Sequence, residues 1–180
     1  GCTLRFQIKN LKNLVKTCLK IFEIDASFCP NLSHFSFFSI FTIRKSLKIL
    51  NLKGTDLSDH SLYGINDFQE LEVLNMSTCK KVEIFLYFAL GRLKKLKSLN
   101  LTGHIHLCDK FLFILVSNLK LLEDLDLSLC TKLTDKSIDA LAGLKMLKRL
   151  SLRGLFNVRD QNVINIIADC SNIECLDLAH

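Results

Sequence analysis

One apolar motif recurs along most of this 180-residue chain at a nearly constant interval. In the pattern L-x-x-L-x-L, an apolar residue is followed by two more, three and five places later. A weak copy, Leu19-Phe22-Ile24, comes first. Six clear copies begin at Leu47, Leu71, Leu96, Leu122, Leu147 and Ile173, at intervals of 24, 25, 26, 25 and 26 residues. A fixed period of this length indicates a stack of similar units, none of which buries its apolar face alone.

The second half of most units predicts a helix. An apolar residue followed two places later by aspartate recurs, as in Leu107 with Asp109 and Leu133 with Asp135. Aspartate is a preferred N-cap because its carboxylate accepts unpaired amide hydrogens of the first turn. We therefore predict that each acid caps the helix of its own unit. Apolar residues three and six places further on would share one helix face. The unit from residue 71 has Ile84 at this position, and we expect a looser helix start there.

Stacked units of this kind predict an α/β solenoid of leucine-rich repeats. The strands would form a curved parallel sheet on the concave side, with helices on the convex side and leucines between the two layers. We assign residues 47–180 to these repeats and expect the repeats to continue beyond residue 180 in a longer protein. Residues 1–46 hold five phenylalanines between positions 28 and 41 and the only proline. We predict a degenerate N-terminal repeat or cap there, with an aromatic-packed irregular helix; an aromatic ligand pocket is the alternative.

The eight cysteines suit packing roles better than disulfides. Cys79 and Cys130 stand eight places after the first leucine of their units, at the turn that leaves the strand. Cys170 occupies an inward position before the next unit. Cysteine is small, apolar and often fully buried. We therefore expect all eight to be reduced, which favours a cytoplasmic or nuclear protein.

Catalytic and cofactor-binding motifs are absent from the sequence. The best metal candidate is the His- and Cys-containing stretch from His104 to Asp109, but no C-x-x-C pair could complete a zinc site. His104 also falls on the repeat position of Cys79 and Cys130, where a turn-capping role competes. No glycine-rich phosphate loop occurs, and no apolar run reaches the ~18 residues of a membrane span. The net charge of +6 is spread over repeat junctions, which argues against nucleic acid. We expect no metal, no cofactor and no enzymatic activity.

The fullest unit, residues 122–141, has the sequence LEDLDLSLCTKLTDKSIDAL. Over about residues 47–180 the chain resembles the cysteine-containing leucine-rich repeats of F-box/leucine-rich-repeat proteins, the substrate receptors of cullin–RING ubiquitin ligases. The resemblance implies a protein–protein interaction scaffold that serves as the substrate-recognition part of such a ligase. Relatives with the same repeat and no F-box serve in axonemal regulatory complexes or as mitochondrial assembly factors. They imply the alternative, a structural subunit of a large axonemal or mitochondrial assembly.

Side chains between the leucines of each strand would point to the concave face. We predict that a protein partner binds there, and that a second surface lies at the open C-terminal end, where Leu176 and Leu178 would be uncovered. On the concave face, aspartates of one strand lie beside arginines of the next, in a charged seam that either pairs internally or binds a polar partner. The predicted partner-binding residues are Asn51, Val73, Asn75, Asn100, Asp124, Asp126, Arg149, Ser151 and Arg153.

Overall fold

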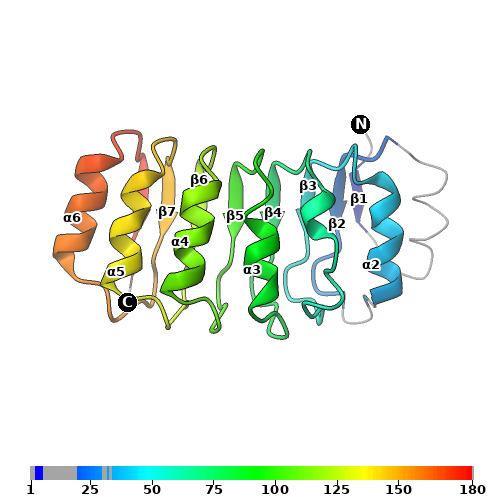
Figure 1. The fold of residues 1–180 in the computed structure, drawn as a ribbon, viewed down its shortest axis with the longest axis horizontal. Helices are drawn as coiled ribbons and strands as arrows, with labels where there is room; N and C mark the ends of the chain where they lie inside the picture. Colours follow the sequence, from blue (N-terminus) through cyan, green and yellow to red (C-terminus); the bar gives the residue numbers. More distant parts are fainter. Residues whose placement is uncertain (1–2, 6–19, 30–31, 33, 180) are drawn as a thin grey trace.

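The computed structural model describes residues 3–5, 20–29, 32 and 34–179. Within them, eight strands form one sheet in which spatial order equals sequence order and all neighbours run parallel. Figure 1 shows the sheet behind a row of helices, with the chain running from the blue end to the red end. The predicted solenoid of leucine-rich repeats is confirmed.

Each strand is three residues long with an apolar residue at its centre. The strands are β1 (Thr3–Arg5), β2 (Glu23–Asp25), β3 (Ile49–Asn51), β4 (Val73–Asn75), β5 (Ser98–Asn100), β6 (Asp124–Asp126), β7 (Arg149–Ser151) and β8 (Cys175–Asp177). The register is constant: Leu50 pairs with Leu74, Leu74 with Leu99, and so on to Leu176. Because every unit presents the same residue at the same place, the central leucines stack in one row.

The elements opposite the sheet are less uniform. They are α2 (His34–Ile40) with the 3₁₀ turn η2 (Phe41–Ile43), the 3₁₀ turn η3 (Ile65–Asp67), α3 (Phe85–Leu90), α4 (Asp109–Asn118), α5 (Asp135–Ile138) with η4 (Asp139–Gly143), and α6 (Asp160–Asp169). The unit from residue 47 therefore has only a 3₁₀ turn where a helix is predicted. Gly64 precedes this turn in the left-handed conformation, at φ 88°, which interrupts any helix there.

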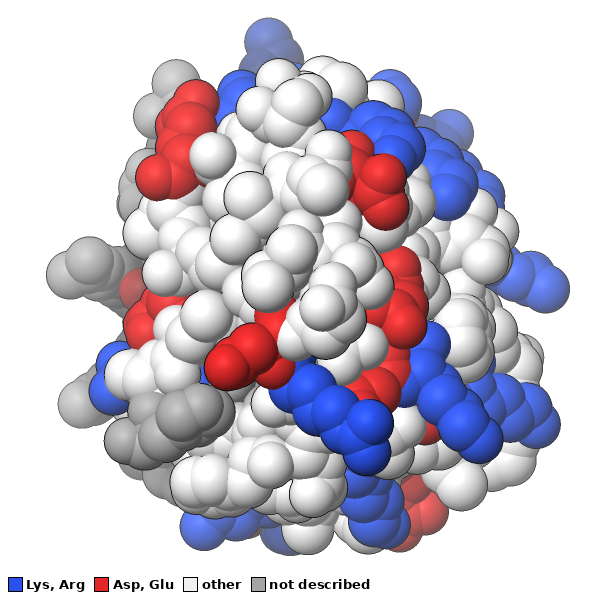
Figure 2. All heavy atoms as spheres, turned by 90° about the vertical axis from the view of Figure 1, so that its left-hand side faces the viewer, with Lys and Arg blue, Asp and Glu red and all other residues white. Residues whose placement is uncertain are grey.

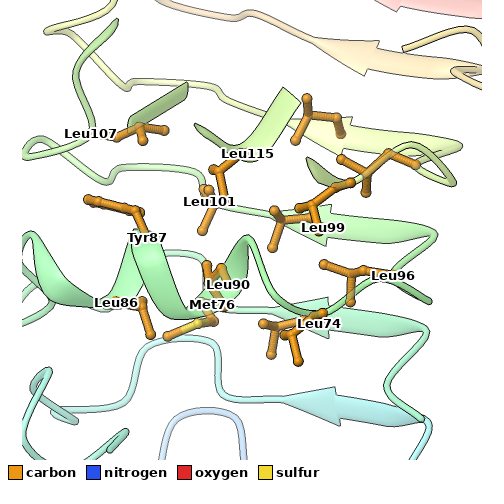
Figure 3. Packing of buried hydrophobic residues seen from close by; sticks show 14 of the residues in the cluster. Leu74, Met76, Leu86, Tyr87, Leu90, Leu96, Leu99, Leu101, Leu107 and Leu115 are labelled. Carbon is orange, nitrogen blue, oxygen red and sulfur yellow. The ribbon is translucent and has the colours of Figure 1, made fainter. Parts of the chain in front are cut away.

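Strand and helix side chains meet in one continuous apolar core. Figure 3 shows Leu86, Tyr87 and Leu90 of α3 packed between strand-side residues that include Leu74 and Leu99. All of them are at most 2% exposed. Truncation of one such leucine to alanine typically destabilises a protein by about 2–5 kcal/mol. The core is shared between units, so each unit depends on its neighbours.

The first clearly described unit differs in register from the predicted one. Its inward residues are Ile21-Ile24-Ala26, each at most 3% exposed. Ile24 pairs with Leu50 of β3. The predicted copy Leu19-Phe22-Ile24 is therefore wrong by two residues, although Leu19 itself lies outside the described residues. Ala26 at the third apolar position is small, so Ile21-Ile24-Ala26 matches the apolar motif less well than Leu19-Phe22-Ile24 does.

The aromatic segment after β2 packs into the core. Phe37 of α2 is buried, and its ring centroid lies 6.0 Å from that of Phe68. Phe41 meets Phe68 edge-on at 5.8 Å. These contacts agree with an aromatic-packed helix and use the inward rings for packing between units. The division at residue 46, and repeats beyond residue 180, stay predictions.

The repeated aspartates secure helix starts, but not in the predicted way. Asp109 is the first residue of α4, and its carboxylate accepts hydrogen bonds from the next unit. The donors are the Thr134 amide at 2.9 Å, the Thr134 hydroxyl at 2.6 Å and the Ser137 hydroxyl at 2.6 Å. Asp135 likewise accepts the Arg159 amide at 3.0 Å. The predicted role as the cap of the acid's own helix is wrong, because each carboxylate points sideways to the neighbouring unit.

The same contact explains how α3 begins. As expected from Ile84, this helix has no side-chain cap of its own. Asp59 of the preceding unit accepts the amides of Glu83, Phe85 and Leu86 at 2.7, 2.8 and 3.3 Å. An acid one unit away therefore supplies the cap.

Asp109→Ala should lower the free energy of unfolding by about 1–2 kcal/mol, the usual effect of losing a helix-capping side chain. Burial raises the pKa of the Asp109 carboxyl, while hydrogen bonds from Ser137 and Thr134 lower it, and the net direction is downward. Urea unfolding followed by circular dichroism measures the change. Asp160→Ala is the matched control, because no described residue donates to its carboxylate. Equal effects of the two substitutions would contradict a cap that acts across units.

Candidate functional site

The sheet face opposite the helices is hollowed into a groove of about 690 Å³. Side chains and loops of β4 to β8 line it. Eight of the nine predicted partner-binding residues are among its lining residues, and Asn51 lies one strand outside. The eight are Val73, Asn75, Asn100, Asp124, Asp126, Arg149, Ser151 and Arg153. The constant register brings these residues together, since equivalent positions of successive strands lie side by side.

The asparagine and aspartate residues that end the strands also have a structural role. The side-chain oxygens of Asn51, Asn75, Asn100 and Asp126 accept the backbone N–H two residues on, at 3.1, 2.9, 2.9 and 2.9 Å. Such a bond closes the turn by which the chain leaves the strand. These side chains therefore stabilise the turns, and only their remaining polar atoms are available to a partner.

The predicted charged seam pairs in part within the protein. Arg149 Nε lies 3.0 Å from Asp124 Oδ2, across β6 and β7. Arg153 turns the other way, and its Nε lies 3.7 Å from Asp177 Oδ2 in β8. Asp126 instead accepts the Asn100 amide at 3.1 Å. Both arginine side chains stay more than half exposed, so each can bind a further carboxylate.

Ser151 departs from the asparagine and aspartate column. Its hydroxyl lies 2.8 Å from that of Ser128 on the neighbouring unit. The two hydroxyls bridge β6 and β7 at the centre of the groove, where one can still accept or donate a hydrogen bond.

Two apolar side chains at one end of the groove were missed by sequence reasoning. Leu129 and Phe156 line the groove, and both are exposed. Leu129 has a left-handed backbone, φ 59°, at the turn position where the next unit has Gly154. A Cβ on Gly154 would lie 2.6 Å from Leu129 Cδ2, so glycine permits this close approach. Leu129, like Thr78, stands at a left-handed turn position that three other units fill with glycine, and this departure was the available signal.

A column of alternating charge, one residue before each of the strands β3 to β8, was also missed. It consists of Lys48, Glu72, Lys97, Glu123, Lys148 and Glu174. Glu72 accepts from Lys48 at 2.9 Å and from Lys97 at 2.8 Å, and Glu123 accepts from Lys148 at 2.7 Å. Hydrogen bonds from Lys97 and Lys48 lower the pKa of Glu72 to about 2. The alternation gives each unit oppositely charged neighbours.

The cysteines and histidine at the strand-leaving turn point inward. The thiols of Cys79 and Cys130 donate to carbonyl oxygens of the preceding unit at 3.1 and 3.2 Å. His104 Nε2 lies 2.8 Å from the equivalent carbonyl oxygen, of Met76. Since a carbonyl only accepts, Nε2 carries the proton, and Nδ1 accepts from the Tyr87 hydroxyl at 3.2 Å. Burial lowers the pKa of His104, in keeping with a neutral ring. These contacts support the turn-capping role.

His104, the first histidine of the candidate metal stretch, therefore has both ring nitrogens engaged in hydrogen bonds inside the fold. Across residues 3–5, 20–29, 32 and 34–179, no cluster of three or more His, Cys, Asp or Glu could hold a metal ion. No helix in that part of the chain is long and apolar enough to cross a membrane. Cys170 is buried as predicted, and none of the six described cysteines is in a disulfide. Cys2 and Cys18 lie outside the described residues.

No family model matches the chain. Its fold is similar to that of solved structures. A TLR13 chain from a TLR13–ssRNA13 complex is 21% identical, with a TM-score of 0.61 over 97% of this chain and 24% of that one. A chain of the Rad7–Elc1 complex of yeast is 16% identical, with a TM-score of 0.54 over 92% of this chain and 60% of that one. The tropomodulin C-terminal domain of Caenorhabditis elegans is 15% identical, with a TM-score of 0.50 over 93% of each chain.

Together with the repeat period and the stacked strand–helix units, these likenesses show that the chain has the leucine-rich-repeat fold. The groove on its sheet face is the candidate site.

Glu72→Gln should make stability less sensitive to acid. The folded pKa of Glu72, about 2, lies below the ordinary value of about 4.3 for an unfolded chain. The ionised group therefore stabilises the fold above about pH 4.3, and this contribution is lost as the pH falls toward 2. Urea midpoints at pH 7, 4.5 and 2.5 should fall less in the variant than in the natural protein. Glu70→Gln, which loses only the pair with Lys95, is the control, and an identical fall in Glu72→Gln and the natural protein would refute the prediction.

Proposed function

We propose that this chain is a protein–protein interaction scaffold whose sheet-face groove binds an extended segment of a partner protein. The observation that carries the proposal is the groove itself, which crosses β4 to β8 and whose lining includes eight predicted residues. Five parallel strands about 4.8 Å apart span about 19 Å, the length of about six extended residues. A short stretch of extended chain therefore fits across the groove.

The charges of the groove favour a polypeptide over a polyanion. Its lining has three carboxylates, of Asp124, Asp126 and Asp177, against two guanidinium groups. Neighbours of similar fold occur in complexes with a protein, in Rad7–Elc1, and with RNA, in TLR13–ssRNA13. The excess of acid here supports the protein alternative, since nucleic-acid binding depends on basic residues. A polar segment with one carboxylate and one apolar residue would pair with an arginine and cover Leu129 and Phe156.

We further propose that the chain forms the substrate-recognition repeats of a cullin–RING ubiquitin ligase. This ligase would work in the cytoplasm or nucleus. The buried Cys79 and Cys130 support this version, because they stand at the cysteine position of the repeats that F-box/leucine-rich-repeat proteins share. The absence of disulfides among the described cysteines is consistent with a reducing compartment.

The second candidate is a structural subunit of an axonemal or mitochondrial assembly. The surface beyond α6 and β8 favours it. Ile164 and Ile167 of α6 are exposed there, and Leu176 and Leu178 are only partly buried. Figure 2 shows uncharged side chains over the upper middle of that end, with acidic and basic side chains crossing below its centre. Such a surface suits a permanent contact, with another protein or with a further repeat of a longer chain.

Charge reversal at Arg149 and Arg153 tests the groove. We expect Arg149→Glu with Arg153→Glu to lose specific partners in affinity purification with mass spectrometry, by at least tenfold. Lys81→Glu with Lys95→Glu is the matched control, because each of these lysines also pairs with one carboxylate. Partners retained by the arginine variant would refute binding in the groove. Recovery of cullin and RING subunits supports the ligase, and recovery of a fixed assembly supports the structural subunit.

A further inference from the structure

The helix face has exposed aromatic residues at one repeated position. Tyr63, Phe88 and Phe113 stand four places after Asp59, Ile84 and Asp109, which are equivalent positions of three successive units. All three aromatic side chains are exposed, Tyr63 to 85%. The next unit has Asp139 at this position, and the series ends there. We call these three residues, together with Phe85, the aromatic stripe.

The stripe contains a groove that follows from the missing helix. Because η3 is a single 3₁₀ turn, it leaves one side of α3 uncovered. A hollow of about 520 Å³ lies there, lined by Tyr63, Phe85 and Phe88 among others. The other side of α3 is closed, since the Phe88 ring meets that of Phe111 edge-on at 5.5 Å. The hollow is thus a recess between two outer elements.

Cations and acids both occur around the stripe, and they differ in what they contact: Asp59 lines the hollow together with Arg92. Arg92 lines the hollow, and Lys110 lies beside the Phe111 ring, with its Nζ 5.9 Å from the centroid. Neither cation pairs with a carboxylate in the described part of the chain. The acids at the same level, Asp59 and Asp109, are engaged by the next unit's amides and hydroxyls. Helix α3 has no charged residue. An occupant with acidic groups would complement this rim.

The spacing of the outer elements fits one kind of occupant. Packed helices lie about 8–10 Å apart. Residues i and i+7 of an α-helix lie on one face, about 10.5 Å apart along its axis. A helix that crosses the outer elements would place residue i in the hollow beside α3 and residue i+7 near Phe113 of α4. A recess of this shape suits a side chain better than a flat bilayer.

We propose that the aromatic stripe binds an amphipathic α-helix of a partner protein, with apolar side chains at i and i+7 and acidic side chains beside them. This surface lies on the opposite side of the molecule from the sheet-face groove. The chain would then hold two partners at once, an extended segment on the sheet and a helix on the outer face.

A phage-displayed library of random 16-residue peptides, selected on the 180-residue chain, tests the proposal. We expect enriched peptides with apolar residues seven apart and an excess of Asp and Glu. Fluorescence anisotropy should show their affinity at least tenfold weaker for Tyr63→Ser with Phe85→Ser, and also for Arg92→Glu. Phe156→Ser is the matched control, because Phe156 is as exposed as Phe85, at 77%, and lies at the sheet-face groove. Its affinity should equal that of the natural chain.

Several results would overturn the proposal. They are no enrichment, enrichment of basic peptides, or affinity lost in Phe156→Ser and kept in the stripe variants. Sedimentation with vesicles of 30% phosphatidylserine that depends on the stripe would replace the peptide with a membrane. Circular dichroism checks the fold, and if the double variant misfolds, Arg92→Glu decides alone. Loss of partners through Arg149 and Arg153 tests the sheet-face groove separately.

Discussion

Each unit of this protein buries its leucines only against the unit beside it, in a register that does not slip over seven strand pairs. The polar contacts obey the same rule. Asp109 accepts hydrogen bonds from Thr134 at the start of the next helix, Cys130 donates to a carbonyl of the previous unit, and Glu72 pairs with lysines on both sides. In each case one unit provides the side chain and a neighbouring unit provides its hydrogen-bond or ion-pair partner. Because no unit is complete alone, order spreads along the stack by contact between neighbours.

This stacking determines what each face can bind. On the sheet, Asn75 and Asn100 use their side-chain oxygens to close turns, so recognition depends on the atoms that remain and on the exposed arginines. On the helix side, the outer faces of the elements are less constrained. Buried leucines hold each element against the sheet, while the length of the element varies from unit to unit. Where Gly64 shortens one element to a 3₁₀ turn, a recess opens beside α3. Both candidate sites lie where residues depart from the regular repeat pattern.

The repeat interval and the alternation of side chains predicted the fold and most of the sheet-face groove. Eight of nine residues lie together since positions equivalent in sequence become neighbours in a parallel stack. Prediction failed where the answer depended on a group outside the local pattern. Phe22 looked more inward than Ala26 because size dominates an apolar motif. The sequence pattern predicts that Asp59 caps the residues directly after it, while the amides that donate to it belong to Glu83, Phe85 and Leu86.

The sequence by itself determined the number of residues per unit, the inward leucines and the turn positions of Cys79, His104 and Cys130. These features follow from local periodicity, because each unit shows the same apolar pattern in its own sequence. Only the tertiary structure decided that Arg153 pairs with Asp177 rather than Asp126, and that Tyr63 and Phe88 share a hollow. Pairing and exposure depend on distances between units, and side chains about 25 residues apart acquire those distances only once the strands are in register.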